Sequence, residues 1–165
     1  MPHLSTARRK ALDAFVVLPL TLLLPACAMR AADMAASAPR DWSLSLYRAT
    51  ADKQFTLFEL SPGGALSFGG GLKAQGRGAA SLATLSTEQR QRLWDIIREH
   101  RLLDAPHRPF DTSTRVQYDL AVRFGASGRR VRTIDDQAPG MEALHDELMS
   151  VVKQTKYGVP YFGEQ

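Results

Sequence analysis

The stretch VQYDLAVRFGASGRRVRTI, residues 116–134, decides the fold class, because it pairs the strongest strand signal of the chain with a turn and a second strand. Large apolar residues alternate with polar or small ones along Val116–Phe124, which is the period of a strand with one buried face. One side of this strand carries Val116, Tyr118, Leu120, Val122 and Phe124, and the other carries Gln117, Asp119, Ala121 and Arg123. Gly125–Gly128 predicts a tight turn onto Arg129–Ile134. We therefore expect an antiparallel hairpin.

Three shorter segments upstream of the hairpin also have strand character. Trp42–Tyr47 and Gln54–Leu60 alternate in the same way, and Ala65–Phe68 follows a turn at Ser61–Gly64 whose proline and glycines favour chain reversal. Short strands joined by compact turns predict an antiparallel meander.

Two amphipathic helices complete the pattern. Ser86–Gln89 has the spacing of a capping box, which predicts a helix that ends at about Leu103. A second helix follows Asp135–Asp136 and Pro139, with Asp136 as the expected cap. Its apolar stripe consists of Met141, Leu144, Leu148, Val151 and Val152. Strands and helices segregated in this order predict an α+β fold, an antiparallel sheet of about five strands with two helices packed on one face.

The beginning of the chain has the build of an export signal. A cationic start at Arg8–Lys10 precedes an apolar run, Ala11–Leu24, that is too short and too interrupted by prolines for a lasting membrane span. The residues Leu23-Leu24-Pro25-Ala26-Cys27 resemble the lipobox of bacterial lipoproteins. That resemblance implies that Cys27 is acylated and becomes the first residue of a mature lipoprotein. Ala28 and Met29 follow it without an aspartate in second place. By the same resemblance this is compatible with transport to the outer membrane, facing the periplasm, while the inner membrane stays an alternative. The alternative is an ordinary cleaved signal that leaves Cys27 as an incidental thiol.

Composition then divides the chain into four parts. We predict a signal peptide over 1–26, a lipid-anchored flexible tether over the alanine-rich residues 27–40, a single α+β domain over 41–158 and a C-terminal tail over 159–165. With one cysteine in the sequence there is no intramolecular disulfide, so stability depends on an apolar core.

The charged residues argue against several classes of function. The formal charge is +4, but acids are interleaved with the arginines, which is unlike a nucleic-acid surface. Gly69–Gly78 lacks the Gly-Lys-Ser/Thr ending of a phosphate loop and predicts a flexible or bulged strand connection. His100, His107 and His145 have no second histidine at the spacing of a metal-binding helix. Asp104, Asp111 and Asp119 are scattered and predict turn or surface positions. The sequence therefore predicts no catalytic residue, no metal ligand and no cofactor.

Two loops remain as candidates for contact with a partner protein. They are the glycine-rich Gly69–Gly78 and the proline-containing Asp104–Arg115. Within them the candidate partner-binding residues are Gly70, Gly71, Lys73, Arg77, His107, Arg108 and Phe110.

The order of motifs also resembles known small domains. The segments LSLYR (44–48), FTLFELSPGGALSFGGG (55–71), LSTEQRQRLWDIIREHRLL (85–103), YDLAVRF (118–124) and VRTID (131–135) look like small bacterial secreted domains of unknown function, and are loosely similar to emfourin, a proteinaceous metalloprotease inhibitor. Two functions are therefore expected: a non-catalytic envelope lipoprotein that binds a protein partner or supports an envelope assembly, or an inhibitor of a secreted or periplasmic hydrolase.

Overall fold

The computed structural model describes residues 36–109, 115–134 and 138–157, which form an α+β fold. The predicted fold class is confirmed, with a sheet of six strands rather than five. The strands are β1 (Trp42–Thr50), β2 (Phe55–Leu60), β3 (Ala65–Gly70), β4 (Ala80–Thr84), β5 (Val116–Phe124) and β6 (Ser127–Ile134). The helices are α1 (Leu72–Gln75), α2 (Thr87–Glu99), a 3-10 turn η2 (Leu102–Asp104) and α3 (Gly140–Tyr157).

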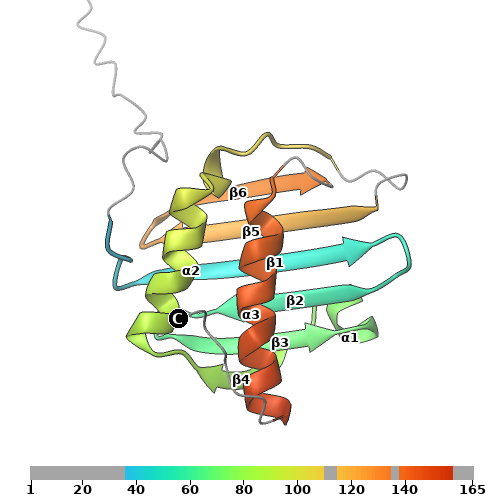
Figure 1. The fold of residues 1–165 in the computed structure, drawn as a ribbon, viewed down its shortest axis with the longest axis horizontal. Coiled ribbons are helices and arrows are strands. Elements are labelled where there is room, and N and C mark those ends of the chain that lie inside the picture. Colours follow the sequence, from blue (N-terminus) through green and yellow to red (C-terminus); the bar gives the residue numbers. More distant parts are fainter. Residues whose placement is uncertain (1–35, 110–114, 135–137, 158–165) are drawn as a thin grey trace, which may run out of the picture.

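The sheet is antiparallel throughout, in the order β4-β3-β2-β1-β5-β6 (Figure 1). Strand β1 lies near the middle, where Leu46 is in register with Phe58 of β2 on one side and with Leu120 of β5 on the other. Side chains of a strand alternate between the two faces, so this register fixes which residues share a face across all neighbouring strands.

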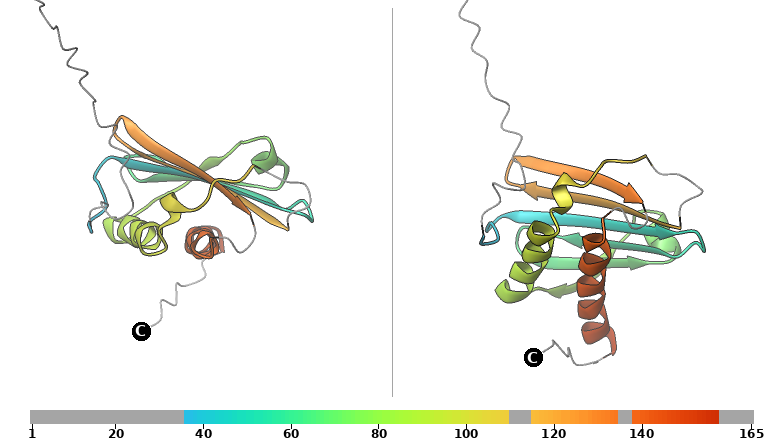
Figure 2. Two further views of the ribbon diagram at one scale, coloured as in Figure 1. Left: turned by 90° about the horizontal axis from the view of Figure 1, so that it is seen from above. Right: turned by 45° about the horizontal axis from the view of Figure 1, so that its top comes forward.

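Helices α2 and α3 cover one face of the sheet, as predicted (Figures 1 and 2). The apolar residues of β1, β2, β5 and β6 that point toward them are almost completely buried, and both helices contribute an apolar stripe. The largest of these buried side chains are Trp42, Trp94, Phe58, Leu46, Leu66, Leu93, Ile97, Leu102, Leu120, Met141 and Leu144. We call this side of the sheet the helix face.

Local sequence signals explain how the helices begin and end. The capping box of α2 is confirmed: the Gln89 amide donates to the Ser86 hydroxyl at 3.2 Å, and the Ser86 amide donates to the Gln89 side chain at 2.9 Å. The helix ends at Glu99 rather than at about Leu103, because Arg101 takes a left-handed conformation, with φ of 50°, that starts the turn η2. Gly140 begins α3 next to α2, where a Cβ would lie 2.3 Å from the Cβ of His100.

The glycine-rich segment differs most from its predicted form. Gly69–Gly78 contains the short helix α1, and the residues after it form the edge strand β4, which pairs with β3 across an irregularity at Leu66 and Ser67. Gly69 is required there, since a Cβ would lie 2.0 Å from the Gly78 carbonyl oxygen. Strand β4 has only five residues, ASLAT, and most of their side chains are small. Its sequence therefore gives little indication of a strand. Similarly, β6 begins at Ser127, two residues earlier than predicted.

The described part of the predicted tether is attached to the folded unit. Gln91 of α2 accepts a hydrogen bond from the Ala38 amide at 2.9 Å and donates one to the Ala36 carbonyl at 3.0 Å, while Arg90 donates to the Arg40 carbonyl at 2.9 Å. Residues 36–40 therefore belong to the folded unit. The predicted signal and Cys27, Phe110, the Asp135–Asp136 cap and the tail over 159–165 lie outside the described residues. No helix in the described ranges has the length and apolar character to cross a membrane.

Candidate binding site on the open face of the sheet

The second face of the sheet is not covered by α2 or α3. Seen from above, both long helices lie on one side of the sheet, and of the helices in the described ranges only the short α1 lies on the other side (Figure 2). We call this side the open face. In β1 and β5 it carries the residues that alternate with the apolar core, so its central strands present Ser43, Ser45, Tyr47, Ala49, Gln117, Asp119, Ala121 and Arg123.

Helix α1 folds over one end of the open face and builds a small second core there. Ala74 of α1 is fully buried against Tyr47 and Leu57, which are themselves almost completely buried. Arg77 follows α1, and its guanidinium lies over the Tyr47 ring, 3.8 Å from the ring centroid. That arrangement combines a cation–π contact with packing of the arginine stem. It places Arg77 at the border of the uncovered part of the face.

Asp119 lies at the centre of an ionic cluster on this face. Arg130 of β6 donates from Nε to Asp119 Oδ1 at 2.7 Å and forms a second hydrogen bond to Oδ2, so the pair is bidentate. Arg77 reaches the same carboxylate at 3.3 Å from Nη2 to Oδ2, and Arg132 places Nε at 3.6 Å. Three arginines from two separate segments therefore converge on one carboxylate.

Asp119 was predicted as a turn or surface residue, and this is wrong. It lies inside β5 and is only 3% exposed, because the three guanidiniums cover it. Burial by itself would raise the pKa of the Asp119 carboxyl. The hydrogen bonds from Arg130 and the positive charges of the arginines outweigh burial and hold that pKa below its ordinary value. Asp119 is therefore ionised at neutral pH, and its carboxylate is bound by the surrounding arginines.

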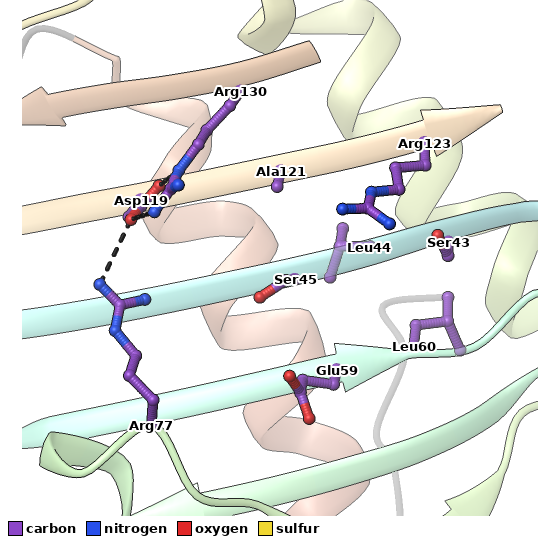
Figure 3. A pocket seen from close by; sticks show the side chains of 10 residues that line it. All are labelled: Ser43, Leu44, Ser45, Glu59, Leu60, Arg77, Asp119, Ala121, Arg123 and Arg130. Carbon is purple, nitrogen blue, oxygen red and sulfur yellow. Dashed lines mark hydrogen bonds and ion pairs between the residues drawn. The ribbon is translucent and has the colours of Figure 1, made fainter. Parts of the chain in front are cut away.

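Next to this cluster the open face is hollowed into a pocket of about 420 Å³ (Figure 3). Small side chains leave the space: Ser43 and Ser45 of β1 lie beside Ala121 of β5. Charged side chains surround them. The residues that line the pocket are Ser43, Leu44, Ser45, Glu59, Leu60, Arg77, Asp119, Ala121, Arg123 and Arg130.

The charged groups around the pocket fall into two sets. Arg77 and Arg130 share ion pairs with Asp119 within the cluster, which keeps a net positive charge. In the described part of the chain, Arg123 and Glu59 have neither an ion-pair partner nor a side-chain hydrogen bond, and both are exposed. Figure 3 shows Arg123 extending from β5 toward the middle of the pocket, with Glu59 on the other side of β1. The pocket lining therefore includes one cation and one anion that are not paired within the described residues.

The predicted contact residues are distributed over two distant parts of the sheet. Arg77 lines the pocket, whereas Gly70, Gly71 and Lys73 are exposed around α1. His107 and Arg108 lie at the edge of β6 instead: the Arg108 amide donates to the Arg132 carbonyl at 2.8 Å, and the Arg132 amide donates to His107 Nδ1 at 3.3 Å. This segment satisfies backbone groups of an edge strand that would otherwise be open to pairing.

Sequence reasoning missed Glu59, Arg123, Arg130 and Asp119 as members of a site. A usable signal was present, because the alternation in Val116–Phe124 already places Asp119, Ala121 and Arg123 on one side. A two-residue turn after Phe124 then brings Arg130 opposite Ala121 and Arg132 opposite Asp119. No comparable sequence pattern predicts that Arg77 joins the Asp119 cluster, because its position depends on the path that the chain takes through α1.

The histidines do not take part in this site. His145 of α3 is on the helix face, where it is 9% exposed and packs edge-on against Phe58 with ring centroids 5.7 Å apart. Burial lowers the pKa of His145, and the hydrogen bond to Asp146, at 3.3 Å, only partly opposes this effect. Within the described ranges no three histidine, cysteine, aspartate or glutamate side chains are grouped as metal ligands would be.

No protein-family model matches the chain, and no curated protein matches its sequence. A carboxylate bound by three guanidiniums is a poor proton carrier, because removing its charge would leave three cations facing one another. A pocket that has small side chains at its floor and charged side chains in fixed positions around it is suited to binding a polar ligand.

Proposed function

We propose that the chain is a non-catalytic module of the cell envelope, anchored to a membrane through acylated Cys27, that binds a protein partner with the open face of its sheet. The observation that carries this proposal is the pocket on that face, with charged side chains held around a floor of Ser43, Ser45 and Ala121. The partner has not been identified, and neither a nucleic acid nor a cofactor is part of the proposal.

The main apolar core and the pocket lie on opposite faces of the sheet, which supports a binding role for the open face. The helix face holds most of the apolar core, including both tryptophans, so stability does not require the centre of the open face to be filled. Arg130, Asp119 and Arg77 are held in place before any partner arrives. A preorganised polar surface loses less conformational entropy on binding than a flexible one.

The anchored location rests on the sequence around Cys27. Its test is the intact mass and membrane partitioning of the full-length protein beside Cys27→Ser, both produced in a Gram-negative host. Added acyl mass in the wild type, together with a soluble or unprocessed variant, supports the anchor. Identical processing of both proteins without added lipid contradicts it and leaves a freely diffusing secreted binder.

The open face is tested by photo-crosslinking in the cells that produce the protein. A residue with a small diazirine side chain, chosen so that it does not fill the pocket, replaces Ser43 or, as the matched control, Lys153, which is exposed on α3. We expect a discrete crosslinked protein from position 43 that disappears when Ser45→Tyr is added to fill the pocket, and none of that product from position 153. A product that forms equally from both positions, or that survives Ser45→Tyr, contradicts binding through the pocket.

Inhibition of a secreted hydrolase remains a second candidate, because one observation favours it. Leu72 is 84% exposed and is the only exposed large hydrophobic residue in the described ranges. It lies on α1, which is fixed to the sheet through Ala74. A rigidly presented apolar side chain is what a protease specificity pocket accepts. Nanomolar inhibition of a secreted metalloprotease that is lost in Leu72→Asp and retained in Ser45→Tyr would support this function instead of the first.

A further inference from the structure

Five charged side chains line the pocket on the open face, and their pairing limits which ligands it accepts. Arg77, Asp119 and Arg130 are already joined by ion pairs of the cluster. Arg123 and Glu59 are exposed and have no such partner among the described residues. Of the charged side chains that line the pocket, these two are the ones whose charge is not already paired within the described residues.

The strand register sets the distance between these two residues. Arg123 of β5 is opposite Ser43 of β1, while Glu59 of β2 is opposite Ser45 of β1. The two residues are thus two strand spacings and one two-residue step apart, which corresponds to about 12 Å between Cα atoms. Since Arg123 extends toward the pocket, the space between the charged ends fits a short segment of another molecule (Figure 3).

We propose that the pocket recognises a short peptide segment of the partner that carries both a carboxylate and a cationic side chain, with the carboxylate bound by Arg123 and the cation bound by Glu59. This inference rests on the proposed function, because it names what the open face binds. A volume of about 420 Å³ is in the range of pockets for small ligands and suits a segment of two or three residues. The hydroxyls of Ser43 and Ser45 supply hydrogen bonds across the floor.

The remaining charges explain why a purely anionic ligand fits less well, despite three arginines around the pocket. A multiply charged anion bound by Arg123 would also approach Glu59, and like charges at close range oppose binding. A purely cationic ligand would meet Arg123, Arg77 and Arg130. A segment with both charges satisfies both available groups and leaves the Asp119 cluster intact.

The test uses capped tripeptides whose only charges are on side chains, so that chain termini do not contribute. The probes are acetyl-Lys-Ala-Glu-amide, acetyl-Glu-Ala-Lys-amide and the singly charged acetyl-Ala-Ala-Glu-amide and acetyl-Lys-Ala-Ala-amide. Each is titrated into full-length protein in a mild detergent at low salt, and backbone amide shifts of Ser43, Ser45 and Ala121 are followed by NMR. We expect one of the two doubly charged peptides to bind at least about fivefold more tightly than either singly charged one, the factor of an exposed ion pair worth about 1 kcal/mol.

Exchanging the charges of residues 123 and 59 is the more specific test. Arg123→Glu combined with Glu59→Lys exchanges the two charges, so the double variant should prefer the doubly charged peptide of opposite order. The matched control combines Lys153→Glu with Glu99→Lys, which makes the same charge changes at exposed positions of α3 and α2. This control should bind like the wild type. An unfolding curve verifies that each variant is folded.

The outcomes separate this inference from the proposed function. If the singly charged anion binds as tightly as the doubly charged peptides, or the double variant keeps the original preference, the assignment of charges is wrong. If the partner crosslinked from position 43 binds Arg123→Glu as well as the wild type, the assignment is also wrong, while binding through the open face stands. If neither peptides nor partner reach the pocket, both proposals are wrong.

Discussion

The two faces of the same sheet differ in almost every respect, although they alternate along the same strands. On β1, Leu44 and Leu46 are buried under the helices, whereas Ser43 and Ser45 form the floor of a pocket. On β5, Leu120 is fully buried on the helix face, and Asp119 beside it is buried by arginines. Burial therefore has two different causes in this sheet: apolar packing on the helix face and charge pairing on the open face.

This difference has an energetic consequence. Apolar burial on the helix face stabilises the fold in proportion to the area removed from water. On the open face the arginines are about half exposed, so water screens their charges, and the buried carboxylate of Asp119 is the group there whose removal should cost stability. We therefore expect substitutions on the helix face to affect unfolding strongly, and most substitutions on the open face to affect binding instead.

The largest effect is expected from Trp94→Ala in α2. Trp94 is 2% exposed and contacts both Trp42, with ring centroids 5.5 Å apart, and Phe124 at 5.4 Å. Removing the indole should lower the free energy of unfolding by about 3–5 kcal/mol, measured by urea denaturation. Ser45→Ala on the open face is the control and should change it by less than about 0.5 kcal/mol. Equal losses would contradict the division between the faces.

The next largest effect is expected from Asp119→Asn. The amide keeps the shape of the side chain but removes the charge that holds Arg130, Arg132 and Arg77 together. We expect a loss of about 2 kcal/mol in the free energy of unfolding, the size of a charged hydrogen-bonded group. A loss below about 0.5 kcal/mol would mean that the cluster does not stabilise the open face.

The same residue predicts an acid dependence with a defined sign. Because the pKa of Asp119 in the folded protein lies below its ordinary value, its contribution is complete above the unfolded-state pKa of about 4 and disappears as the pH falls through the folded pKa. Urea denaturation at a series of pH values should show the difference between wild type and Asp119→Asn shrinking below about pH 4. A difference that stays constant down to pH 2 would contradict this assignment.

A smaller effect is expected from Arg77→Ala, which removes both the contact with Tyr47 and the ion pair with Asp119. We predict a loss of about 1 kcal/mol. Hydrogen exchange should accelerate in α1 and β4 but not in α2. Arg77→Lys keeps the charge but loses the flat stacking surface and should recover only part of the loss. Uniform acceleration across the domain would show that Arg77 does not act through α1.

The smallest predicted effect concerns His145 on the helix face. Since burial lowers its pKa in the folded protein, the unfolded chain binds a proton more readily, and stability should fall as the pH drops below about 6.5. Asp146 and Glu142 favour the proton, while Arg48 opposes it. His145→Leu should show a flatter pH profile than the wild type between pH 5 and pH 7. Identical slopes would mean that His145 does not contribute.

The sequence predicted elements whose signals are local. The capping box at Ser86–Gln89 and the alternation in Val116–Phe124 both depend on neighbours within a few residues, and both were found where expected. Strand β4 was missed because ASLAT has only one large side chain, Leu82, and therefore displays no period, and the strand forms by pairing with the edge of β3. Tertiary context decides such short segments.

The candidate site was less predictable, because it is assembled by register and by loop path. Asp119 and Arg130 are 11 positions apart in the chain, and Arg77 is 42 positions from Asp119. The length of the turn in the hairpin sets the register of β5 and β6, so it could have predicted that Arg130 lies close to Asp119. Nothing local places Arg77 over Tyr47, since that contact requires α1 to fold back across the sheet.

The most direct test of the account measures stability and partner capture on one variant, Ser45→Tyr. Tyrosine fills the pocket floor on a strand that tolerates it well. We predict that the free energy of unfolding stays within about 0.5 kcal/mol of the wild type, while crosslinking to the partner from position 43 is lost. Retained crosslinking with unchanged stability would contradict the central claim that this molecule binds through the open face of its sheet.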